Sequence, residues 1–334
     1  MVIDRLSVYD TIYALASDKG CEKVLFGDCA PLAHKAFQQS LIGDKFPLLW
    51  FEVPLAGNPR FDLHVALSRE SLHAGVQFLP GAGNSYDELF RWYSENETGG
   101  GGLTFAYDVS ERRIDNPAVH VNVNNAPLTN ISRFFDLVAG DGAYVRYSDF
   151  ENRLPQGWRI WYTGVHPGRP GSPVRVDCFV SPALKAAYAG DITQLEHDLH
   201  ACGFTATSPA LRDLVMPILE SPFSLELQFD VMCDNTLGTT LGVSAGFPFV
   251  NEAGTRKLFN DGGTIAHLMN RIEDMGLADK RWRHIPDATF ATLIRVDGSA
   301  LALYCVPTFL KMRMRDGKPL DAKTYLQAGA SVLR

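Results

Sequence analysis

The chain has no Lys/Arg-rich run and no long apolar stretch, and these two absences exclude several classes of protein. Its 334 residues carry a net charge of −7, so it lacks the clustered cations with which nucleic-acid-binding proteins neutralise phosphates. No apolar segment approaches the roughly 18 residues that span a bilayer, and the first residues lack the basic-then-apolar order of a signal peptide. We therefore expect a cytoplasmic protein that binds neither nucleic acid nor membranes.

Cysteine is also sparse, and no two cysteines form a Cys-x-x-Cys pair. Three of the six stand among apolar residues, so we expect buried reduced thiols rather than disulfides or zinc ligands. The glycine run at 99–102 is not followed by Gly-Lys-Ser/Thr, and there is no His-Glu-x-x-His or Gly-x-Ser-x-Gly motif. The cysteines are Cys21, Cys29, Cys178, Cys202, Cys233 and Cys305.

What the chain does have is internal repetition. Four segments place apolar residues at i, i+3, i+4 and i+7, one of them less completely, as in an amphipathic helix. Each follows two segments with strand-like alternation, and Asn, Asp, Gly and Pro occupy the turns between them, which is typical of β-hairpins. The helical segments are 86–93, 131–138, 192–199 and 265–272. The strand pairs are 47–55 with 61–68, 103–110 with 117–124, 158–165 with 173–181, 225–232 with 239–247, and 291–296 with 300–314.

Alternation within these strands indicates which face is covered. In segment 174–180, Val174, Val176, Cys178 and Val180 alternate with polar or aromatic residues, and segments 61–68 and 117–124 repeat the pattern. Successive side chains of a strand point to opposite faces of the sheet. Because the helices need an apolar face to cover, the apolar side should face them and the polar side should face away.

The polar face has two possible surroundings. In an open two-layer sheet it would meet water, whereas in a closed barrel it would line a cavity, and closure also removes the sheet edges. We predict the second arrangement: an α+β fold in which five ββα(α) repeats form a ten-stranded antiparallel β-barrel with a ring of helices outside. A single domain is expected over residues 1–334. Its repeats are expected at 46–98, 103–150, 157–220, 222–285 and 289–330, the last ending in a weak helix near 323–327.

Three blocks of sequence resemble a known family. They are PLLWFEVPLAGNPRFDLHVALS, AYDVSERRIDNPAVHVNVNNAPLTNISRFFDLVAGDGA and GWRIWYTGVHPGRPGSPVRVDCFV. With the strand–strand–helix repeat, they resemble the ABBA prenyltransferases, and most closely the peptide-modifying enzymes of cyanobactin biosynthesis. The resemblance covers roughly residues 30 to 315.

The resemblance implies a reaction as well as a fold. A prenyltransferase of this kind moves a C5 or C10 isoprenyl group, from dimethylallyl or geranyl diphosphate, to a side chain of a macrocyclic RiPP peptide. It implies Mg²⁺ as cofactor and the prenyl diphosphate as co-substrate, and we expect a monomer. Cations must stabilise the departing diphosphate, aromatic faces must shield the allylic cation, and a carboxylate must take the acceptor's proton.

The resemblance also suggests roles for two acidic residues of the first unit. The family places a glutamate base on the first strand, so Glu52 is the expected catalytic base. Asp62 occupies the position where small-molecule members of the family hold magnesium, a cation that prefers hard oxygen ligands. Metal ligation and acceptor binding are both open for Asp62, and a solvated strand glutamate is the alternative for Glu52.

Diphosphate-binding residues are expected on the inward positions of the strands. The candidates are His64, His120, Arg175 and Arg295. Here the sequence departs from the family, because Asn122 and Asn124 stand where cations are usual and Thr240 replaces an arginine. Lys311 is one further cation on a predicted strand that could contact the diphosphate. The expected diphosphate clamp is therefore thin.

Aromatic and acidic residues complete the predicted lumen. Phe179, Tyr162 and Tyr304 are the candidates for shielding the allylic cation, although the pattern places only Phe179 on the inward face. The candidates for acceptor binding are Asp62, Asp177, Asp230 and Glu226. So many acids, with Glu52, suggest a cationic acceptor such as an arginine guanidinium, which a carboxylate pair binds bidentately. The alternatives are an aromatic small-molecule prenyltransferase and a non-catalytic barrel that binds a ligand.

Overall fold

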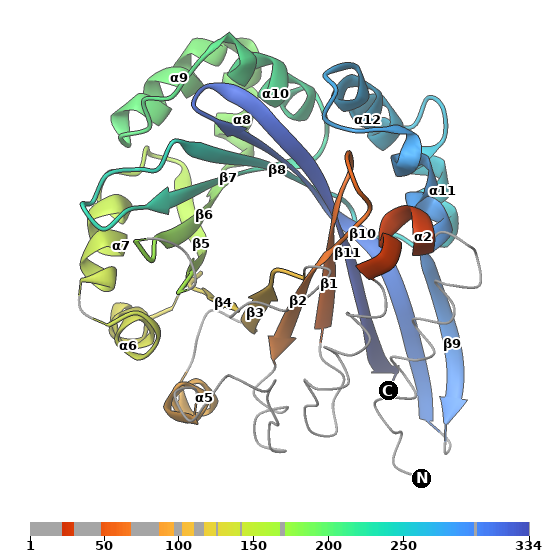
Figure 1. Cartoon of the computed structure of the whole chain (residues 1–334), viewed down its shortest axis with the longest axis horizontal. Coiled ribbons are helices and arrows are strands. Elements are labelled where there is room, and N and C mark those ends of the chain that lie inside the picture. The colour runs from red at the N-terminus through yellow and green to blue at the C-terminus, as the bar shows by residue number, and fades with distance from the viewer. Residues whose placement is uncertain are drawn as a thin grey trace.

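The computed structural model describes residues 22–29, 48–67, 87–96, 102–109, 117–124, 126–140, 142–167, 171–296 and 299–333. Within these residues, antiparallel strands form one large sheet, and helices lie along its outside (Figure 1). The strands are β1 (Leu48–Pro54), β2 (Asp62–Leu67), β3 (Leu103–Tyr107), β4 (Ala118–Asn122), β5 (Trp158–Val165), β6 (Val174–Val180), β7 (Ser224–Val231), β8 (Thr240–Gly246), β9 (Phe290–Val296), β10 (Ser299–Arg315) and β11 (Lys318–Leu333).

The sheet closes on itself through its last hairpin. Strands β1 to β8 pair consecutively, β8 pairs with β10, β10 with β11, and β11 with β1. Ten strands therefore form a closed antiparallel barrel, as the sequence predicted. Closure leaves no exposed edge within the ring.

The fifth unit differs from the prediction in two respects. Strand β9 pairs with the first part of β10 as expected, but it lies outside the ring, whose fifth hairpin is β10–β11. Residues 323–327, expected to form a weak helix, belong to β11. Lys323 and Tyr325 contact Glu52 on one face, whereas Thr324 and Leu326 lie on the opposite face and have no exposed surface. This period of two is that of a strand, which explains the difference.

Helices and 3₁₀ segments pack on the outside of the barrel (Figure 1). They are α2 (Glu22–Leu25), η1 (Gly27–Cys29), α5 (Asp87–Glu95), α6 (Leu128–Val138), α7 (Ala143–Glu151), α8 (Pro182–Gly190), α9 (Ile192–Ala201), α10 (Pro209–Leu219), α11 (Glu252–Phe259), α12 (Thr264–Asp274) and η3 (Lys280–Ala288). Side chains cap several of them at the N-terminus. Ser181 accepts from the backbone of Leu184, and Asp191 from that of Thr193.

The main apolar core lies between the helices and the outer barrel face. Val174, Val176 and Cys178 on β6 have no exposed surface, and neither have Phe134 on α6 and Leu195 on α9. Burying each such side chain stabilises the fold by about 1.5–3 kcal/mol. The predicted inversion, with apolar residues facing out toward the helices, is confirmed.

Two further expectations bear on the chain as a whole. Cys178, Cys202 and Cys305 are buried free thiols, as expected, whereas Cys233 is free but exposed. Cys21 and the side chain of Cys29 lie outside the described residues. No helix in the described part of the chain is long and apolar enough to cross a membrane.

Candidate active site

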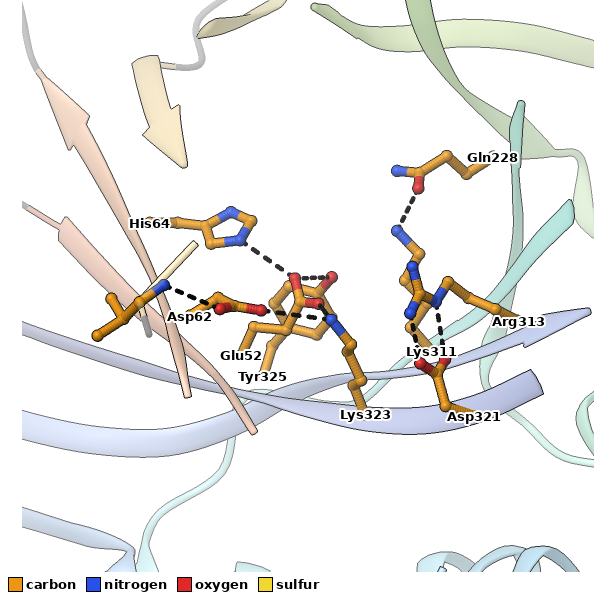
Figure 2. A network of polar contacts seen from close by, with 10 residues as sticks. Glu52, Asp62, His64, Gln228, Lys311, Arg313, Asp321, Lys323 and Tyr325 are labelled. Atoms are coloured by element: carbon orange, nitrogen blue, oxygen red, sulfur yellow. Dashed lines mark hydrogen bonds and ion pairs between the residues drawn. The ribbon is translucent and has the colours of Figure 1, made fainter. Parts of the chain in front are cut away.

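The polar faces of the strands meet inside the barrel. Registered neighbours include Glu52 with Asp62, Arg175 with Asp230, and Asp177 with Gln228. Since directly opposite residues of paired strands lie on the same face of a sheet, this register carries one polar face around the ring. The side chains form two clusters that lie side by side in the lumen (Figure 2).

The first cluster surrounds Glu52 on β1. Its carboxylate accepts hydrogen bonds from Lys323 and from the Tyr325 hydroxyl at 2.6 Å, and His64 Nε2 lies 3.2 Å away. Lys323 Nζ also lies 3.4 Å from Asp62, whose other oxygen accepts from the Val109 backbone at 3.1 Å. One lysine thus bridges two buried carboxylates (Figure 2).

The electrostatics of this cluster keep Glu52 ionised. Burial opposes its charge, but Lys323 and then His64 outweigh that cost and hold the pKa of Glu52 well below its ordinary value. Burial and the neighbouring Glu52 charge raise the pKa of Asp62, and the same two causes raise that of Tyr325 far above the usual phenol range. The arrangement therefore holds an anionic carboxylate in contact with a neutral phenol and an ammonium group.

The predicted magnesium site at Asp62 does not fit these surroundings. Asp62 faces the ammonium group of Lys323 and a backbone N–H, both of which compete with a metal ion for its oxygens. Among the described residues, no group of three or more His, Cys, Asp or Glu side chains is arranged to hold a metal. The lysine supplies the positive charge at this position.

The second cluster is centred on Lys311 of β10. Its ammonium group donates to Gln228, whose amide donates in turn to Asp177 at 2.6 Å (Figure 2 shows the first of these contacts). Lys311 is buried, and no carboxylate of the described residues is within ion-pair distance of it. Burial lowers the pKa of Lys311 to about 8, although Asp177 opposes the shift. Gly242 leaves room for it, because a Cβ there would lie 3.0 Å from the lysine Cε.

Two arginines flank Lys311 and are held by aspartates. Arg175 binds Asp230 through two hydrogen bonds of 2.8 and 2.9 Å, and Arg313 binds Asp321 in the same bidentate way. Both arginines lower the pKa of Lys311, which shows that the three cations share one region. Asp230, expected to bind an acceptor, is thus occupied by Arg175.

His120 lies on the inner face next to a required glycine. It is buried, its ring meets His166 edge-on with centroids 5.4 Å apart, and it lies over Gly164 of β5. A Cβ on Gly164 would be 2.3 Å from His120 Nδ1 and 2.5 Å from the Val119 carbonyl. No side chain larger than hydrogen fits at this position without displacing the histidine.

We therefore expect Gly164→Ala to destabilise the protein by about 1–3 kcal/mol, the usual cost of overpacking a filled site. Urea denaturation measures the change. The control is Gly190→Ala at the end of α8, where an added Cβ meets nothing within 4 Å. Equal urea midpoints for the two variants would show that His120 does not hold this position.

The predicted shielding aromatics lie in different places. Tyr162 is largely buried beside Asn122, with its pKa raised mainly by burial. Phe179 carries the guanidinium of Arg159 at 5.0 Å from its ring centroid, so one cation already occupies that aromatic face. Tyr304 lies further along β10, near Phe249 and Gln327. The aromatic residue that contacts Glu52 is instead Tyr325, whose ring neighbour on β10 is Phe309, with centroids 6.3 Å apart.

The structure brings together most of the predicted site, but not all of it. Glu52, Asp62 and His64 form one cluster, and Asp177 belongs to the other. Arg295 lies on β9, outside the ring, and its side chain is outside the described residues, so its role stays a prediction.

Three important residues were missed: Arg313, Lys323 and Tyr325. All lie on the closing hairpin, where Lys-x-Arg at 311–313 and Asp-x-Lys-x-Tyr-x-Gln at 321–327 alternate with apolar or small residues. This period-two pattern was the available signal.

No family model and no curated protein matches this sequence. Among solved structures, AnaPT from Neosartorya fischeri is similar: 10% of residues are identical, the match covers 85% of this chain and 77% of that chain, and the TM-score is 0.47.

Proposed function

We propose that this protein is a prenyltransferase that moves a C5 or C10 isoprenyl group from an allylic diphosphate to an electron-rich aromatic acceptor. Lys311 carries the proposal. A buried ammonium group is costly unless an anion accompanies it, yet Lys311 donates to a neutral amide, and no carboxylate of the described residues lies within ion-pair distance of it. A diphosphate supplies the missing negative charge at Lys311, next to the ion pairs Arg175–Asp230 and Arg313–Asp321.

The remaining lumen groups suit the chemistry of that ligand. The allylic C–O bond breaks with its electron pair leaving on the diphosphate, whose growing charge the cations stabilise. The rings of Tyr325 and Phe309 offer aromatic faces to the allylic cation. An aromatic carbon of the acceptor then forms the new C–C bond, and the proton it loses passes to the ionised Glu52. A carboxylate of low pKa is a weak base, but the protonated ring intermediate is a far stronger acid.

The acceptor follows from how the lumen acids are paired. An arginine acceptor needs free, ionised carboxylates. Asp230 binds Arg175, Asp62 contacts Lys323 and Asp177 accepts from Gln228, while burial raises the pKa of Glu226 to about 8 and leaves it uncharged at pH 7. These pairings favour a neutral aromatic ring over a guanidinium group. A Tyr or Trp side chain of a macrocyclic peptide meets this requirement as well as a free aromatic molecule does.

The direct test incubates the full chain with dimethylallyl or geranyl diphosphate, with and without Mg²⁺, and with one acceptor at a time. The acceptors are indoles, phenols, and matched cyclic peptides containing Trp, Tyr or Arg. We expect a mass gain of one prenyl unit on aromatic acceptors. A gain on the Arg peptide alone would overturn the aromatic assignment, and no gain with any acceptor would support a non-catalytic binding barrel.

Lys311→Met tests the diphosphate site separately. We expect the affinity for inorganic diphosphate to fall at least about tenfold at pH 7, because one charge-assisted contact is lost. Since Lys311 discharges as the pH rises through about 8, the difference between wild type and variant should shrink at pH 9.5. Isothermal titration calorimetry measures both affinities.

The same variant has an opposite expected effect on stability. Replacing a buried ammonium group that lacks a carboxylate partner by an apolar chain of similar size should leave the urea midpoint unchanged or raise it. A strong loss of stability together with unchanged diphosphate affinity would show that Lys311 is a structural residue.

A further inference from the structure

A cavity opens at one mouth of the barrel, next to the two charged clusters. Its volume is about 540 Å³, which is in the range of pockets for small organic ligands. Its walls come from the start of β7, the segment after β8, and the middle of β10 and β11. The side chains that matter here are Phe223, Phe247, Phe249, Phe309, Gln327 and Glu226. A pocket walled by four phenylalanines suits a flat aromatic ligand.

Glu226 is the ionisable group in this apolar lining. It lies on β7 between Phe179 and Ser244 of the neighbouring strands and is 8% exposed. Its carboxyl group accepts a long hydrogen bond of 3.4 Å from the Ser224 hydroxyl, and among the described residues no cation lies within ion-pair distance. The other lumen acids all have close partners: Glu52 has Lys323, Asp177 has Gln228, and Asp230 has Arg175. Buried carboxyl groups without partners are rare and costly, so this one is available to a ligand.

The surroundings keep this carboxyl group neutral. Burial and then the charge of Asp177 on β6 raise the pKa of Glu226 to about 8, and Ser224 and Lys311 only partly oppose them. Tyr162 on β5 faces it as well, and its hydroxyl is itself neutral because burial raises its pKa. Below about pH 8 the group is therefore a carboxylic acid with an O–H to donate.

We infer that this mouth cavity binds the aromatic ring of the acceptor, and that the carboxyl group of Glu226 donates a hydrogen bond to a lone pair on that ring system. The inference rests on the proposed function and narrows its substrate class. The acceptor is a neutral, flat aromatic molecule, or aromatic side chain, that carries an oxygen or nitrogen lone pair. Once Glu226 is ionised, its negative charge repels an anionic acceptor from this cavity.

Quinoline and naphthalene test this inference, since they have nearly the same shape and only quinoline carries a ring lone pair. Binding of each to the full chain is measured by ligand-observed NMR, without prenyl diphosphate. At pH 6.5 we expect quinoline to bind about tenfold more tightly, the effect of one hydrogen bond to a buried donor. At pH 9.5 the ionised carboxylate cannot donate, so the preference should disappear.

Variants separate the hydrogen bond from the shape of the cavity. Glu226→Gln keeps a donor at every pH and should retain the preference at pH 9.5, whereas Glu226→Leu should abolish it at both. The exposed Glu220→Gln serves as the matched control and should behave as wild type. Equal binding of quinoline and naphthalene by the wild-type chain at pH 6.5 would overturn the inference, and needs no variant to fold. Because no diphosphate is present, this result is independent of whether prenyl transfer occurs.

Discussion

Lys323→Met is expected to destabilise the protein by about 3–5 kcal/mol at pH 7, the usual cost of removing one partner from a buried ion pair. The lysine is 6% exposed and is shared by Glu52 and Asp62, which would be left as adjacent buried acids. Urea denaturation measures the loss. The control is Lys318→Met on the same strand, an exposed lysine whose removal should change the free energy of unfolding by less than about 0.5 kcal/mol.

The stability lost in Lys323→Met should depend on pH, and the direction of that dependence follows from the pKa of Glu52. The folded pKa of Glu52 is depressed, so its stabilising contribution is present above its ordinary value and is lost as the pH falls through the folded pKa. The difference between wild type and Lys323→Met should therefore narrow on acidification. Adding Glu52→Gln to Lys323→Met should recover part of the stability, because one buried charge is removed with its partner. If the double variant were as unstable as the sum of the singles, the two residues would not act as a pair.

Glu52→Gln is expected to lower kcat for prenyl transfer by about 10²–10⁴, the contribution of a positioned proton acceptor. The amide keeps the shape of the side chain but cannot take the proton from the acceptor ring. Since Lys323 keeps Asp62 as a partner, the variant should remain folded. Steady-state kinetics with dimethylallyl diphosphate give kcat and KM, and the KM for the donor should change little.

The matched control for this substitution is Glu220→Gln on the surface, which should retain the wild-type rate. A product with the prenyl group attached at a different atom would indicate that Glu52 positions the acceptor rather than deprotonating it. Full activity of Glu52→Gln would remove Glu52 from the mechanism and leave its contacts with Lys323 and Tyr325 as structural.

The barrel and its inverted packing could be predicted from the sequence because both follow from the alternation of apolar and polar residues within single strands. Strand β6 shows this best: its valines alternate strictly with Arg175, Asp177 and Phe179, and the structure places the valines beneath helices. Glu52 and Asp62 were predicted one by one from the family resemblance, and the structure places them opposite each other in one hairpin.

The predictions failed where pairing is not local. Nothing in the composition of β9 distinguishes it from a ring strand, so its position outside the barrel depends on β8 pairing with the second half of β10. Residues 323–327 of β11 were mistaken for a weak helix although their period of two was visible, and the pairing of β11 with β1, far away in the chain, has no local signal. Because of this error Lys323 was not predicted as a lumen residue, and the lumen therefore seemed richer in acids than it is.

The same closure has a consequence for how the protein is made. The Glu52 carboxylate and the Lys323 ammonium group are 271 positions apart in the chain, and they meet only when β11 pairs with β1. Contacts of such large sequence separation form late and slow the folding of β-rich domains. During synthesis, Glu52 and Asp62 therefore lack Lys323 as a partner until the β10–β11 hairpin has been made. The enclosed lumen therefore forms only in the step that completes the ring.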